Sequence, residues 1–164
     1  MRRLDLRVLF SLIILCIVQA AYYYPRLPSS VASHFDVSGQ PDSWSSKDSF
    51  VLTNIATIAG ISIICLGIAS LLRRIPISWI NLPNKDYWLA PERKDDTLST
   101  LSMQFGWLAC ATVALFIAMF QITILANLST DKTLGNTSWL FIGLYLAFTA
   151  IWIVRLLRRF ARVP

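Results

Sequence analysis

The residues of this sequence that could do chemistry gather in one short polar segment. His34 is the only histidine of the chain, and Asp36, Gly39, Asp42 and Lys47 follow it closely. A histidine beside carboxylates is typical of a general base or of part of a metal site. However, one histidine with scattered carboxylates supplies few ligands, and the sequence has no recognisable triad, phosphate loop or metal-ligand pair. We therefore expect no enzyme activity, no metal and no cofactor, and interpret these five residues as binding or loop-locking groups.

The segment that carries these residues, 25–49, is far longer than a connection between two helices requires. Phe35 and Val37 alternate with His34 and Asp36, which predicts a short extended piece. The residues 38–42 that follow, Ser-Gly-Gln-Pro-Asp, are typical of a tight turn. We expect a structured loop with a function or a fold of its own.

Four apolar runs must position this loop. Only 15% of the 164 residues are charged, against about 25% in soluble domains, and about 20 apolar residues span a bilayer as a helix. The sequence predicts an all-α membrane protein, a single integral domain over 1–164, with spans at about 8–24, 50–72, 100–126 and 135–155. The first run also fits a cleavable signal peptide, although three tyrosines before Pro25 favour an uncleaved anchor. None of the four runs has an Asp, Glu, Lys, Arg or His in its interior. Proton and ion pathways normally use such residues, so the sequence does not favour a pump or an ion-coupled transporter.

The basic residues are distributed in a way that predicts the orientation. The amino end holds three, the loop 73–100 five and the carboxyl tail four, whereas the two alternate segments hold three together. The positive-inside rule then places both termini in the cytoplasm and the loop 25–49 outside. The net charge of +6 is thus a topology signal, and the expected partner is the lipid bilayer rather than nucleic acid.

Two loop motifs resemble a known family. Leu27-Pro28, His34-Phe35, Ser38-Gly39, Pro41-Asp42 and Lys47 resemble the bacterial domain of unknown function 1648, which also forms the amino-terminal part of SdpI-like toxin immunity membrane proteins. The resemblance covers about residues 8–75. It implies a multi-pass protein of the bacterial cytoplasmic (inner) membrane, whose outside loop binds a peptide or a membrane-protein partner in an immunity-type role. The alternative is a structural or accessory subunit of a membrane complex with no ligand of its own.

The inside loop is similar to that of small members of the same family. Its motif consists of Asn84, Tyr87, Trp88, Glu92 and Arg93. The aromatic residues suit the headgroup layer, and the prolines at 76, 83 and 91 forbid one continuous helix. Two interpretations stay open, an anchor on the membrane surface and a site for a ligand or partner.

Small residues recur at every fourth position of the third span. This row is Ser102, Gly106, Cys110, Ala114 and Ala118. Small side chains let helix backbones approach closely in lipid, so we expect the third span to be the central packing element. Pairing with a second copy through the same face stays open. Polar side chains expected to add interhelical hydrogen bonds are Asn54, Thr57, Gln104, Gln121 and Thr123.

Overall fold

A computed structural model describes residues 3–72 and 74–163 of the chain. Four of its helices are long and apolar enough to cross a membrane: α1 (Arg3–Tyr23), α2 (Lys47–Leu71), α4 (Lys94–Leu128) and α5 (Thr137–Ala161). The four predicted spans are confirmed as helices, and the protein is a multi-pass membrane protein by this measure. The helices extend beyond the uncharged runs, so that α1 includes Asp5, which is buried. Two basic residues used to predict orientation, Arg2 and Arg73, lie outside the described residues.

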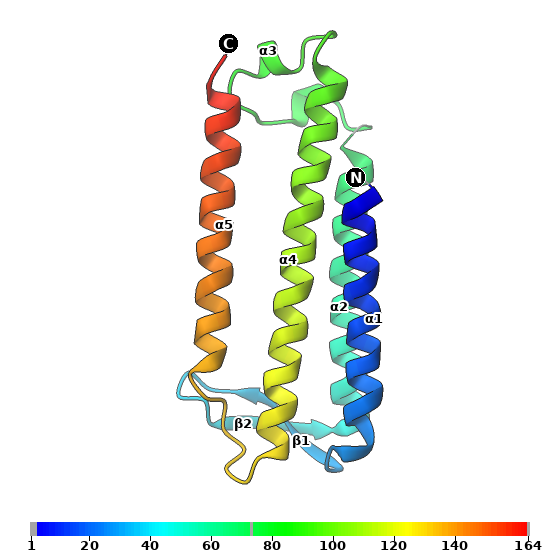
Figure 1. The fold of residues 1–164 in the computed structure, drawn as a ribbon, viewed down its shortest axis with the longest axis vertical. Coiled ribbons are helices and arrows are strands. Elements are labelled where there is room, and N and C mark those ends of the chain that lie inside the picture. The colour runs from blue at the N-terminus through cyan, green and yellow to red at the C-terminus, as the bar shows by residue number, and fades with distance from the viewer. Residues whose placement is uncertain (1–2, 73, 164) are drawn as a thin grey trace.

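The helix α4 stands at the centre of the fold (Figure 1). It packs against α1, α2 and α5, and α1 also touches α2. The main core lies between α1, α2 and α4, where its buried side chains include Leu9, Cys16, Ile58, Val113 and Phe120. In contrast, α5 buries only Ser138 and Phe160. One side of α4 is therefore tightly packed, and the other carries a single, largely exposed helix.

A β-hairpin crosses one end of the helices, which corrects the prediction of an all-α fold (Figure 1). After the short helix η1 (Tyr24–Arg26), β1 (Ser30–Phe35) pairs antiparallel with β2 (Pro41–Ser46). The helix α2 follows β2 without a linker. Its first turn is capped by the Ser46 hydroxyl, which accepts a hydrogen bond from the backbone N–H of Ser49 at 3.2 Å. The predicted extended piece and turn are thus two strands of a sheet.

The opposite end of the bundle holds both termini and the loop between α2 and α4 (Figure 1). This loop contains two short helices, η2 (Ile77–Trp79) and α3 (Lys85–Trp88), separated by one segment that contains Pro83. A second core lies beneath it, formed by Leu72, Ile80, Leu89, Leu98, Leu101 and Phe160. The loop is therefore folded onto the ends of α4 and α5.

Two of the expected interhelical hydrogen-bonding residues do join helices. Gln121 on α4 accepts a hydrogen bond from Gln19 Nε2 on α1 at 2.7 Å and donates to the Tyr23 hydroxyl at 3.0 Å. Gln104 accepts one from Trp152 Nε1 on α5 at 3.1 Å. Asn54 instead donates to the Phe50 carbonyl of its own helix. Such contacts hold helices together in lipid, where burial of apolar surface supplies no driving force.

Candidate functional site

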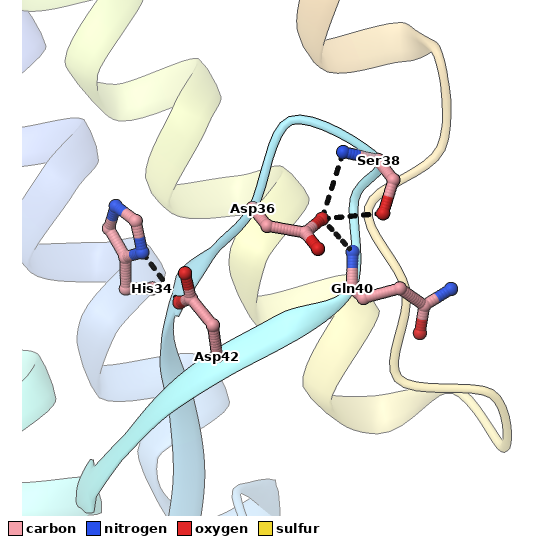
Figure 2. Close-up of polar contacts among 5 residues, drawn as sticks. All are labelled: His34, Asp36, Ser38, Gln40 and Asp42. Carbon is pink, nitrogen blue, oxygen red and sulfur yellow. Dashed lines mark hydrogen bonds and ion pairs between the residues drawn. The ribbon is translucent and has the colours of Figure 1, made fainter.

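The turn of the hairpin is built around the carboxylate of Asp36 (Figure 2). One of its oxygens accepts hydrogen bonds from the Ser38 N–H at 2.8 Å, the Ser38 hydroxyl at 2.7 Å and the Gln40 N–H at 2.9 Å. These donors, with the Ser38 hydroxyl first, hold the pKa of Asp36 below its usual range. Asp36 is exposed, and this carboxylate oxygen thus serves to form the turn.

His34 and Asp42 form an exposed pair on neighbouring strands (Figure 2). The two residues come together because β1 and β2 are paired across the turn. His34 Nδ1 lies 2.6 Å from Asp42 Oδ1, and the side chains are 70% and 44% exposed. The contact fixes the ring and leaves Nε2 available to bind a partner. Among the described residues, His34 has no further hydrogen-bond partner, and no three His, Cys, Asp or Glu side chains lie together as a metal site would require.

Gly39 fastens the turn to the loop between α4 and α5. Its backbone has a φ of +81°, which suits glycine. The Gly39 carbonyl accepts a hydrogen bond from the Leu134 N–H at 2.9 Å. A Cβ at this position would overlap the Leu134 carbonyl oxygen. Gly39 therefore has a structural reason to be glycine that the sequence motif did not reveal.

The outer edge of β1 is closed by Asn127, near the end of α4. The Ala32 N–H donates to Asn127 Oδ1 at 2.6 Å, and Asn127 Nδ2 donates to the Ala32 carbonyl at 2.9 Å. Both residues are buried. The side-chain amide thus makes the two hydrogen bonds that a peptide group of a third strand would make. Asn127 was not predicted from the sequence, where its only signal is a polar residue near the end of an apolar run.

The outer edge of β2 remains open. Trp44 lies opposite Ala32 in the register, and because Ala32 directs its N–H and carbonyl away from β2, Trp44 directs its own away from β1. No described residue hydrogen-bonds to these backbone groups of Trp44. The Trp44 side chain is 47% exposed, with the Lys132 ammonium 5.0 Å from the ring centroid. Among the described residues, the hairpin is therefore paired at Ala32 on the edge of β1 and unpaired at Trp44 on the edge of β2.

Lys47 lies apart from the His34–Asp42 pair. Its ammonium sits 4.7 Å from the centroid of the Tyr24 ring, and the Tyr24 hydroxyl donates to Asp48 Oδ1 at 2.6 Å. Lys47 thus belongs to a small cluster where α1 ends and α2 begins. The five predicted loop residues therefore do not form one constellation: the side chains of His34 and Asp42 are in contact, and the Gly39 N–H donates to the Asp36 carbonyl at 3.0 Å within the turn.

Comparison with known proteins identifies part of the chain. Residues 11–58 match the model of a domain of unknown function, DUF1648. The match confirms the resemblance to DUF1648 over the greater part of α1, the hairpin and the first half of α2, a shorter stretch than the predicted 8–75. No curated protein matches the chain, and neither does any solved structure.

Outside the DUF1648 segment, the inside-loop motif forms a clamp on the end of α5. Asn84 Nδ2 donates to the carbonyls of Phe160 and Ala161 at 3.0 and 2.9 Å, and Trp88 Nε1 donates to the Phe160 carbonyl at 2.8 Å. The last carbonyls of a helix lack intrahelical partners, so these donors satisfy them. Asn84 has a φ of +51°, a conformation that asparagine tolerates better than most residues.

Of the other three motif residues, Arg93 contacts Tyr87, whereas Glu92 does not take part in this contact. Arg93 Nε donates to the Tyr87 carbonyl at 2.8 Å, and its guanidinium lies 3.9 Å from the centroid of the Tyr87 ring. Glu92 is exposed and makes no side-chain hydrogen bond with a described residue. The contacts within this loop therefore hold the loop itself in place.

The row of small residues on α4 changes its environment along the helix. Ser102, Gly106 and Cys110 are buried, whereas Ala114 is exposed and Ala118 is half-buried. The buried face continues instead through Val113, Ile117, Phe120 and Ile124. The amino-terminal part of the row lies within the bundle, and Ala114 and Ala118 line grooves on its surface.

Proposed function

We propose that this protein is a small integral membrane protein that binds an extended peptide segment along the free edge of β2. The observation that carries the proposal is the contrast between the two edges of the hairpin. Asn127 fills the edge of β1, while the backbone groups of Trp44 point to an edge with no described partner. An exposed strand edge is a ready template for a further strand.

The side chains around this edge give the proposed site its selectivity. Main-chain hydrogen bonds supply affinity in strand addition, and the flanking side chains select the sequence. The His34–Asp42 pair offers a polar contact, and the half-exposed Trp44 ring offers an aromatic one. The proposal includes no catalytic step, because the pair is not accompanied by a hydrogen-bonded nucleophile among the described residues.

The proposal places the hairpin outside the cytoplasmic membrane of a bacterium. The distribution of basic residues supports this orientation, and the fold puts both termini at the end opposite the hairpin (Figure 1). The match of residues 11–58 to DUF1648, together with the resemblance to SdpI-like immunity proteins, supports a membrane-active peptide toxin as the ligand class. The protein would then bind the toxin at the membrane surface.

The test compares two variants of Trp44 in the full-length protein in lipid nanodiscs. A displayed library of random linear peptides is selected on the wild type, and the recovered peptides are measured against both variants. Trp44→Pro removes the outward N–H but no β1–β2 hydrogen bond, because Ala32 and Trp44 are not hydrogen-bonded to each other. Trp44→Ala keeps the N–H and removes the ring. We expect Trp44→Pro to abolish binding and Trp44→Ala to weaken it.

Two outcomes would contradict the proposal. If peptides bind the wild type and Trp44→Pro equally, they do not use the edge of β2. If the library yields no binder, the protein has no site for a linear peptide. A protein that binds no peptide but purifies with a stoichiometric membrane partner is the accessory subunit of the alternative hypothesis. For the toxin role, His34→Ala with Asp42→Ala should lower the survival of toxin-challenged cells at equal membrane abundance.

A further inference from the structure

A groove runs along the side of the bundle between α1, α4 and α5, far from the hairpin. Its volume is about 660 Å³, within the range of roughly 300–1,000 Å³ usual for ligand sites. Its apolar lining includes Val8, Leu12, Trp107, Ala114, Phe148 and Ile151. The groove exists because α1 and α5 both pack against α4, and α5 buries only Ser138 and Phe160.

One end of the groove is strongly basic. Arg155 and Arg159 line it, and residues four apart lie one above the other on the same face of a helix. Neither guanidinium has a hydrogen-bond or ion-pair partner among the described residues. No acidic side chain lines the groove within the described part of the chain. The groove therefore suits a ligand with an anionic group at the end that holds the two arginines and an apolar remainder along its length.

The apolar lining continues beyond this groove along α1 and α4 toward the hairpin end. Leu12 and Ala114 also line a second groove of about 500 Å³, between α1 and α4. A molecule anchored at Arg155 and Arg159 can therefore extend a flexible hydrocarbon tail past Ala114. The side chain of Ala114 is small and exposed, which leaves this passage open.

We propose that the groove binds one anionic phospholipid, with its phosphate at Arg155 and Arg159 and an acyl chain along Leu12 and Ala114. Basic pockets between membrane helices suit anionic headgroups, and arginine pairs well with phosphate. A second copy of the chain fits less well, because copies with the same orientation carry these arginines at the same depth, where like charges repel. The site is independent of the hairpin and of the proposed peptide binding.

The experiment measures lipid adducts on the full-length protein by native mass spectrometry. Phosphatidylglycerol and phosphatidylcholine with identical acyl chains are the two probes. The test variant is Arg155→Gln with Arg159→Gln, and the matched control is Arg158→Gln with Arg162→Gln. Both pairs remove two positive charges at or just beyond the carboxyl end of α5. However, Arg158 and Arg162 are not among the described residues that line the groove. Ala114→Phe, which keeps all charges and narrows the passage, is the third variant.

We expect the wild type to prefer phosphatidylglycerol and the test pair to lose about tenfold or more of this binding, since each basic residue near an anionic membrane surface contributes roughly fivefold. The control pair should retain most of the binding, and Ala114→Phe should lower it. Circular dichroism and size-exclusion chromatography check that each variant is folded. An equal loss in both arginine pairs would show general surface attraction and overturn the site. Equal binding of both lipids, or dimers in place of lipid adducts, would overturn it as well.

Discussion

Asn127 holds Ala32 through two hydrogen bonds that join residues 95 positions apart in the chain. The Ala32 N–H donates to the side-chain carbonyl, and the side-chain NH₂ donates to the Ala32 carbonyl. A single amide side chain thereby fixes the hairpin to the end of α4 and closes the edge of β1. On the other edge of the hairpin, no described residue hydrogen-bonds to the outward backbone groups of Trp44.

The first prediction concerns this contact. Asn127→Leu leaves the buried N–H and carbonyl of Ala32 without partners, which costs about 1–3 kcal/mol for each unsatisfied group. We expect the Ala32 amide proton to exchange faster by at least about tenfold, measured by hydrogen exchange in detergent micelles. Asn54→Leu is the control, because Asn54 donates only to its own helix. Unchanged exchange at Ala32 in the Asn127 variant would contradict the assigned role.

The second prediction concerns the hairpin turn. Gly39→Ala combines a strained positive φ with overlap on the Leu134 carbonyl, and the left-handed conformation alone costs a non-glycine residue about 1–2 kcal/mol. We expect a lower unfolding temperature and loss of protection at the Leu134 amide. Gly135→Ala is the matched control in the same loop, since a Cβ there meets nothing within 4 Å. If both variants behave alike, the turn and the loop are not coupled as described.

The third prediction concerns the pH dependence of the turn. The pKa of Asp36 is lowered in the folded protein, first by the Ser38 hydroxyl and then by backbone donors. A lowered pKa stabilises the fold above the unfolded value, about 3.9 for Asp, and this stabilisation is lost as the pH falls through the folded pKa. Carboxyl NMR of the folded protein should therefore show Asp36 titrating below the usual range. Ser38→Ala should raise the pKa, and an unchanged titration would rule out the hydroxyl as the main cause.

The fourth prediction concerns the clamp on α5. Asn84→Ala removes two hydrogen bonds to the end of the helix and places alanine at a positive φ. We expect a loss of about 1–3 kcal/mol in local stability and faster cleavage by trypsin after Lys85. Asn81→Ala is the control, because Asn81 is an exposed residue of the same loop and forms no side-chain hydrogen bond with a described residue. Equal cleavage rates in the two variants would argue against the clamp.

The sequence predicted the helices well because length and apolar composition decide which segments can span a membrane. Their ends were harder to predict, since charged residues stop an apolar run without stopping a helix. The helix α4 begins at Lys94 rather than near 100, with Asp95 and Asp96 in a first turn that favours negative charge. Similarly, α5 continues past Arg155 to Ala161, because basic residues suit the last turn of a helix.

The hairpin could be predicted only in part. Local residue types such as Ser38-Gly39 indicated the turn, but the roles of Gly39 and Ala32 depend on Leu134 and Asn127, which lie about a hundred residues away. The His34–Asp42 contact depends on strand register, which the sequence pattern alone did not define. Likewise, the row of small residues predicted the side of α4 that packs at Gly106 but not its exposure at Ala114.

The helix α4 has a contact to each end cap of the molecule. Asn127 binds the hairpin near one end, and near the other the Thr97 hydroxyl donates to the Trp88 carbonyl at 2.8 Å. At roughly 1.5 Å per residue, the two anchors lie about 45 Å apart along the axis, close to the full thickness of a bilayer with its headgroups. The hairpin and the inside loop are thus held on one helix at a separation that matches the bilayer, and we expect a markedly thinner or thicker bilayer to fit the protein less well.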